Sequence, residues 1–126
     1  MEEKEVYEKV LTSLYEGLKT EKHNKFKNNK LGERNYLVGE LYPDVIMINK
    51  ETENVDFIVE IVLSKQYNNN KIIFEKWKPL SEIGSVFYLL VPNNEKNKIE
   101  KIIIENNFKI RIGTYEIKNN NVNINF

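Results

Sequence analysis

The chain has 126 residues, 19 basic and 19 acidic side chains, and no cysteine. This length suits one domain, residues 1–126, with its own hydrophobic core. The absence of cysteine excludes disulfides, thiolate zinc sites and cysteine nucleophiles. A formal net charge of zero argues against a protein that coats nucleic acid mainly through phosphate contacts. The charged first residues and the lack of an apolar run of about 20 residues predict no membrane segment and a cytoplasmic location.

The first 18 residues predict an amphipathic helix, because Val6, Val10 and Leu14 recur near helical spacing. Residues 19–33 are polar and predict a loop. This stretch and its end carry a cluster of basic side chains. Its members are Lys19, Lys22, Lys25, Lys27, Lys30 and Arg34. The cluster is either a solvated surface or a phosphate-contacting loop beside a catalytic face.

The next segments predict extended structure. Residues 36–38 form a short extended piece, and Gly39 allows a bend. A strand over 44–48 follows Pro43, and a polar turn at 49–54 leads to a second strand over 55–63. Both strands are nearly continuous apolar runs, which is typical of strands covered on both faces.

The second half alternates helices and strands. Asparagines at 68–70 predict the start of a helix near Lys71, with a kink or break at Pro79. One face of that helix is expected to carry Ile73, Trp77, Leu80 and Gly84. A buried strand over 86–91 follows.

After that strand, Asn93 or Asn94 is expected to cap another helix, whose Ile99, Ile102 and Ile103 point inward. Strands over 108–117 and 122–126 pair across an asparagine turn. Together the elements predict an α/β domain with a mixed central β-sheet flanked by helices.

Two carboxylates occupy positions where burial is costly, namely Asp44 at the start of one apolar strand and Glu60 within the next. A hairpin centred on Thr52 would pair Ile48 with Asp56 and Asp44 with Glu60, which brings both carboxylates to one face. Two like charges at this spacing repel, and a divalent cation would relieve the conflict. Oxygen ligands of this kind suit Mg²⁺ or Mn²⁺.

A different interpretation stays open at this point. A one-residue slip of the hairpin would send the two carboxylates to opposite faces. Asp44 would then be a turn residue after Pro43, and Glu60 would pair with a lysine.

The pair Pro43-Asp44, followed sixteen residues later by Glu60 within Val-Glu-Ile-Val, resembles the motif of the PD-(D/E)XK nuclease superfamily. The segment from Glu75 to Pro92 is similar to small archaeal and viral members. The resemblance covers roughly residues 1–92. It implies a restriction-endonuclease-like αβββαβ core, to which the last helix and strands are additions.

The resemblance implies that Asp44 and Glu60 hold the metal and that the protein hydrolyses DNA, as a homodimer by the same analogy. The superfamily's lysine would fall at Val62, so a lysine from the following helix is expected to replace it. Lys76 is the first candidate, with Lys65 and Lys71 as alternatives.

Glu16 on the first helix would be a further metal ligand, by the same resemblance, and the alternative is that it is plain helix surface. Two other functions remain open. One is a nuclease-fold domain that has lost catalysis and acts in nucleic-acid binding or protein assembly. The other is a structural α/β adaptor in which the carboxylate pair is accidental.

Overall fold

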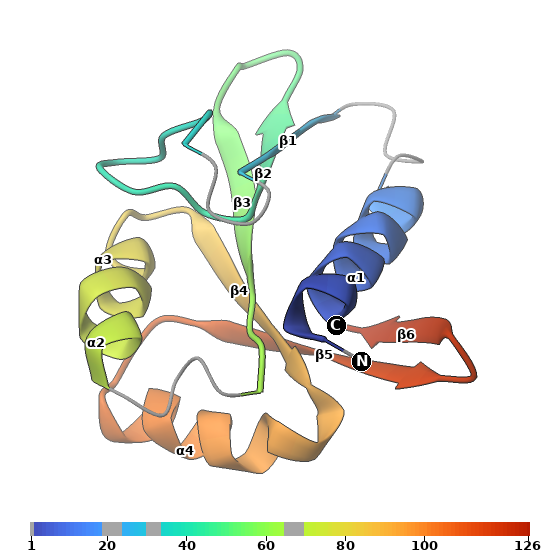
Figure 1. Ribbon diagram of the computed structural model, residues 1–126. Coiled ribbons are helices and arrows are strands. Elements are labelled where there is room, and N and C mark those ends of the chain that lie inside the picture. Colours follow the sequence, from blue (N-terminus) through green and yellow to red (C-terminus); the bar gives the residue numbers. More distant parts are fainter. Residues whose placement is uncertain (1, 19–23, 30–33, 65–69) are drawn as a thin grey trace.

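The computed structural model describes residues 2–18, 24–29, 34–64 and 70–126. The described chain forms a six-stranded sheet with helices on both faces (Figure 1). Helix α1 (Glu3–Leu18) lies against one face, and the helical segments between β3 and β4 lie against the other. The expected α/β class and the mixed sheet flanked by helices are therefore confirmed.

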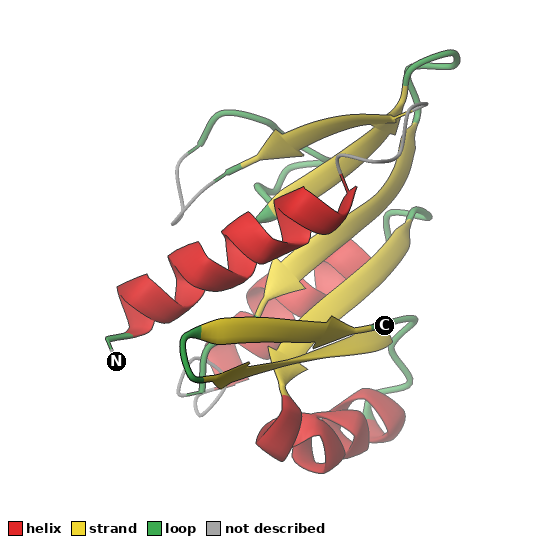
Figure 2. Ribbon diagram, turned by 90° about the vertical axis from the view of Figure 1, so that its right-hand side faces the viewer, coloured by secondary structure: helices red, strands yellow, loops and turns green. Residues whose placement is uncertain are grey.

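The strands follow one another across the sheet in chain order. They are β1 (Asn24–Asn28), β2 (Val45–Asn49), β3 (Val55–Ile61), β4 (Val86–Pro92), β5 (Arg111–Lys118) and β6 (Asn121–Asn125). The first three alternate in direction, β3 to β5 run parallel, and β6 returns antiparallel. Each parallel pair needs a long crossover, and helices supply both crossovers. Figure 2 shows α1 crossing the opposite face of the sheet from these helices.

The β2–β3 hairpin has the register on which the carboxylate prediction depends. Val45 pairs with Val59 and Ile46 with Ile58, so the next position outward sets Asp44 against Glu60. A bulge separates Met47 from Ile48. Ile48 consequently pairs with Val55, and the expected pairing of Ile48 with Asp56 is wrong. The bulge lies between the turn and the residue pairs next to the carboxylates. It therefore leaves the pairing beside Asp44 and Glu60 unaffected.

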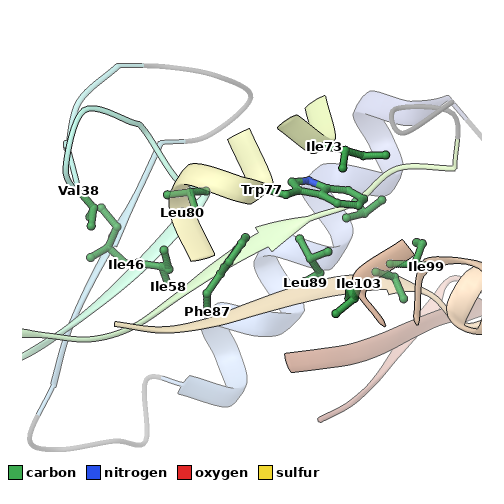
Figure 3. Close-up of a cluster of buried hydrophobic side chains, with 12 residues drawn as sticks. Val38, Ile46, Ile58, Ile73, Trp77, Leu80, Phe87, Leu89, Ile99 and Ile103 are labelled. Atoms are coloured by element: carbon green, nitrogen blue, oxygen red, sulfur yellow. The ribbon is translucent and has the colours of Figure 1, made fainter. Parts of the chain in front are cut away.

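Two apolar clusters fill the space on either side of the sheet. The cluster on the side of the helices that follow β3 is centred on fully buried Trp77 and Leu80, which meet Ile46, Ile58 and Phe87 from the strands (Figure 3). The cluster on the other side joins α1 to the sheet. Its buried members are Tyr7, Val10, Leu11, Leu14, Val45, Val59, Ile61, Leu63, Leu90 and Tyr115. Burial on both faces explains why β3 and β4 read as continuous apolar runs.

The first crossover is one helical stretch of mixed geometry. It comprises α2 (Asn70–Ile72), a π-helical turn (Ile73–Trp77) and α3 (Lys78–Ser81). The helix does not break at Pro79, since helical backbone continues to Ser81, and the irregularity lies in the π-helical turn directly before the proline. The widened turn directly before the proline gives its ring room that a regular helix lacks. Ile73, Trp77 and Leu80 share the buried face as expected.

One expectation for this crossover needs correction. Gly84 lies beyond the helix, in a turn with φ +98°, and is not on its buried face. The helix begins at Asn70, close to Lys71 as expected, while residues 68 and 69 lie outside the described residues.

The interpretation of residues 19–33 as a loop is wrong over 24–28, where the chain forms β1 and pairs with β2. This is an edge strand, and Phe26 is the one apolar residue in it, so it lacks the hydrophobic pattern that signals a strand. Residues 36–38 are not a strand. Val38 instead makes one bridge with Leu41, and Gly39 occupies the bend at φ +63°.

The C-terminal part follows the prediction with one exception at the helix start. Residues 93–95 form a short 3₁₀ turn, and α4 (Lys96–Glu105) begins without a side-chain cap from Asn93 or Asn94. Ile99 and Ile103 are buried as expected. The strands β5 and β6 pair across a two-residue turn in which both asparagines have positive φ. None of the helices in the described ranges is both long and apolar enough to cross a membrane.

Candidate active site

Asp44 and Glu60 meet where β2 begins and β3 approaches its end. The backbone N–H of Asp44 donates to Oε1 of Glu60 at 2.8 Å. The N–H of Ile61 donates to Oδ2 of Asp44, also at 2.8 Å. Each strand thus orients the carboxylate of the other. The two residues are 6% and 3% exposed, so this is a buried pair, as their position in apolar strands suggested.

Lys76 reaches the pair from the π-helical turn. Its Nζ lies 2.9 Å from Oε2 of Glu60, and its side chain is 28% exposed. Among the named members of the cluster, Lys76 therefore has the most contact with solvent. Because π turns recur at functional sites, the local geometry around Lys76 is itself informative. Val62, two residues after Glu60, is buried in the apolar cluster beneath this helix.

Tyr7 contributes from α1 on the opposite face of the sheet. Its hydroxyl donates to Oδ1 of Asp44 at 2.7 Å. Tyr7 was not predicted to belong to the site. A buried tyrosine usually needs a hydrogen-bond partner for its hydroxyl. A tyrosine on the buried face of a predicted helix is therefore the sequence feature that could have pointed to Tyr7. With this contact, each of the four carboxylate oxygens of Asp44 and Glu60 accepts a hydrogen bond or ion pair from the protein.

The electrostatics of the cluster follow from burial. Desolvation, reinforced by the nearby Asp44 charge, raises the pKa of Glu60 to about 8, although Lys76 opposes the shift. Burial also raises the pKa of Asp44, against the opposing ammonium of Lys76. Burial lowers the pKa of Lys76, but the charges of Glu60 and Asp44 outweigh it and raise that pKa overall. At neutral pH the two carboxyls therefore hold a proton between them, and the lysine stays charged.

The other predicted site residues lie elsewhere. Glu16 is an exposed residue of α1, nine positions beyond Tyr7 and about 13 Å along the helix axis. The described residues contain no group of three or more acidic, histidine or cysteine side chains able to hold a metal. The described structure therefore does not bring Glu16 together with Asp44 and Glu60, and its role as a third ligand stays a prediction. Lys71 is exposed on α2, and Lys65 lies outside the described residues.

Asn29 is the second residue that sequence reasoning missed. It follows β1 and is fully buried. Its amide nitrogen donates to the carbonyl of Pro43 at 2.8 Å, and its backbone N–H donates to the carbonyl of Asp44 at 3.0 Å. Asn29 thus holds the peptide that carries the catalytic candidate. Nothing in a polar stretch of sequence distinguishes such an asparagine from a surface one.

Protein-family models, curated protein sequences and solved structures were compared with this chain, and none of them matches it.

Proposed function

We propose that this protein is a metal-dependent nuclease that hydrolyses DNA phosphodiester bonds, with Asp44 and Glu60 as metal ligands and Lys76 as the accompanying lysine. The observation that carries the proposal is the meeting of these three side chains in one buried cluster. Buried carboxylates with raised pKa values and a specific charged partner are frequent at functional sites.

The order of elements supports a restriction-endonuclease-like core. The resemblance implies a helix, three strands, a helix and a strand, and the chain has α1, β1 to β3, the 70–81 helical stretch and β4 in that order. The lysine also arrives from the helix that follows the glutamate strand, as expected once Val62 replaces the usual lysine. Two separate features of the resemblance thus agree with the fold.

The side chains fit a hard divalent cation such as Mg²⁺ or Mn²⁺. Once the shared proton is released, two carboxylates and one ammonium give the buried cluster a net charge of −1, which a bound cation would balance. Magnesium in phosphate-processing sites is typically held by one or two protein carboxylates, with water and substrate oxygens completing its shell. When bound, the cation would activate water and stabilise charge on the scissile phosphate.

The protein's own groups would orient these ligands. Tyr7 and the N–H of Ile61 fix the Asp44 carboxylate from two sides, and the Asp44 N–H fixes Glu60. Lys76 would neutralise phosphate charge at the solvent-facing part of the cluster and position the attacking water. These contacts come from elements on both faces of the sheet, so they would hold the Asp44 and Glu60 side chains in place before the reaction.

A second candidate is a nuclease-fold domain without catalysis. The hydrogen bonds and the ion pair that reach all four carboxylate oxygens of Asp44 and Glu60 favour this candidate. Carboxylates with such partners are also stable without a metal. The ion pair between Glu60 and Lys76 is also what the alternative interpretation of the sequence expected. The two candidates differ in whether divalent cations bind and DNA is cut.

The test is a cleavage assay on supercoiled plasmid, single-stranded and branched DNA in Mg²⁺, Mn²⁺ or EDTA. Asp44→Asn and Glu60→Gln are expected to abolish cutting while keeping side-chain size. Glu16→Gln, an exposed glutamate outside the cluster, is the matched control and is expected to cut like wild type. Cutting that survives in EDTA or in Asp44→Asn refutes the mechanism, and no cutting by a folded wild type selects the inactive candidate.

A further inference from the structure

The segment from Arg34 to Tyr42 is fastened to the sheet by one buried amide. The Asn29 side chain donates to the carbonyls of Tyr36 (2.7 Å) and Pro43 (2.8 Å). Its oxygen accepts from the N–H groups of Asn35 (2.9 Å) and Tyr36 (2.7 Å). Two donors and two lone pairs are all that an asparagine amide offers, so its capacity is fully used. One side chain therefore closes both ends of this segment onto the start of β2.

Two cations of this region rest on tyrosine rings. The Nζ of Lys27 lies 4.7 Å from the Tyr36 ring centroid, and the guanidinium carbon of Arg34 lies 5.9 Å from that of Tyr42. Neither cation has a carboxylate partner within the described ranges of the chain. A ring face holds a cation in place without taking up its N–H donors, so these donors stay available to an anion.

Lys27 faces the same side of the sheet as the candidate active site. It pairs with Ile46, which pairs with Ile58, and both isoleucines lie in the cluster beneath the helix that carries Lys76. Directly paired residues share a face. Two residues of strand rise and one strand spacing put the backbone of Lys27 about 8 Å from that of Asp44.

The segment 34–42 lies over this same face. Val38 packs into the cluster near Ile46 (Figure 3). A side chain added at Gly39 would approach Ile83, just beyond α3, to 3.2 Å. The aromatic residues that hold the two cations are therefore anchored on the side from which Lys76 enters the site.

We propose that Lys27 and Arg34, each held over a tyrosine ring, bind phosphates of a nucleic-acid strand beside the position held by Asp44 and Glu60. The inference rests on the proposed function, because it names how the substrate of that site is held. Phosphates of one strand follow at about 3.4 Å along the helix axis. A lysine whose backbone lies about 8 Å from that of Asp44 would therefore contact a near neighbour of the scissile phosphate. The basic cluster noted in the sequence thus has two described members beside the site.

Binding is measured separately from cutting, by fluorescence anisotropy of a labelled 20-nucleotide single strand and its duplex in EDTA at several salt concentrations. Each of Lys27→Gln and Arg34→Gln is expected to weaken binding about five- to eightfold at 0.1 M salt. Each should also lower the slope of log affinity against log salt by about 0.7 for the single strand and 0.9 for the duplex. Lys109→Gln, an exposed lysine that precedes β5, is the matched control and should leave both unchanged.

The tyrosine rings are tested at an exposed position, so that folding is preserved. Tyr36 is 40% exposed. Tyr36→Phe should bind like wild type because the ring remains, whereas Tyr36→Leu should weaken binding as Lys27→Gln does. Equal effects of the two Tyr36 variants would overturn the role of the ring.

The outcomes separate this inference from the nuclease proposal. DNA binding that depends on Lys27 and Arg34, without cutting, keeps the surface and refutes the nuclease. Cutting with a KM that neither substitution changes keeps the nuclease and overturns the surface. Displacement of the oligonucleotide by polyglutamate of equal charge, or no binding by wild type, also overturns the assignment to nucleic acid.

Discussion

Raising the pH should destabilise this protein, because its folded state holds a proton that the unfolded chain releases. Burial, together with the neighbouring Asp44 charge, raises the pKa of Glu60 from the ordinary value of 4.5 to about 8. Between these two values the folded protein binds more protons than the unfolded chain. The stability contributed by the retained proton is complete below about pH 4.5 and is lost as the pH rises through 8.

The size of the effect follows from linkage. One extra proton in the folded state changes the free energy of unfolding by about 1.4 kcal/mol per pH unit. Between pH 5 and pH 7 the protein should therefore lose about 2–3 kcal/mol. That is a large share of the roughly 5–15 kcal/mol that holds an ordinary domain together. The raised pKa of Lys76 does not contribute in this range, because that ammonium is charged throughout.

The assay is urea unfolding in EDTA at pH 5, 6, 7 and 8, followed by the fluorescence of Trp77. This is the one tryptophan in the sequence, and it is fully buried. Glu60→Gln removes the titrating group, so its stability should fall much less with pH than that of wild type. Subtracting the two curves removes the contributions of ionisable groups that do not interact with Glu60, and leaves those of Glu60 and of Asp44 beside it. A wild-type stability that is flat or rises from pH 5 to 7, or an equal slope in both proteins, would refute the reasoning.

Further outcomes follow from the same contacts. Mg²⁺ or Mn²⁺ should raise the melting temperature more at pH 8 than at pH 5.5 in thermal-shift measurements, because the deprotonated carboxylate pair is the form that binds a cation. Asp44→Asn should abolish this rise. Tyr7→Phe should cost about 1.5–3 kcal/mol in urea unfolding, since a buried hydrogen bond to a carboxylate is lost. Trp77→Ala should cost about 3–5 kcal/mol in the same assay because it opens a cavity at the centre of the larger cluster. A cost below about 1 kcal/mol for either substitution would contradict the packing described above.

The pairing of Asp44 with Glu60 was predictable because the position of the turn in a hairpin determines which residues of the two strands face each other. The turn lies at the expected place, and apolar residues on both strands leave few alternative registers. The contact of Lys76 with Glu60 was within reach for the same reason, since the apolar stripe of the helix shows which residues border the sheet. Patterns driven by burial are readable because many residues report the same orientation.

The contributions of Asn29 and of β1 were not predictable in this way. A polar edge strand buries little, so its sequence carries no alternation to detect. The role of Asn29 depends on carbonyls and amides of residues 35–44, which every sequence possesses. Glu16 was selected by analogy, whereas the helix turns Tyr7 toward the site. A single hydrogen bond between distant segments produces no repeating pattern of residues in the sequence, so it cannot be predicted from one.

The bulge between Met47 and Ile48 makes the β2–β3 turn a suitable place for modification. The turn residues 50–54 are exposed, and the bulge absorbs one extra residue before the pairing next to Asp44 begins. Because the two strands already differ in length at the bulge, a change in the turn is expected to have little effect on the paired residues beside Asp44. A fluorophore, affinity tag or crosslinker placed at Thr52 would therefore report on the protein from the end of the hairpin remote from the carboxylates.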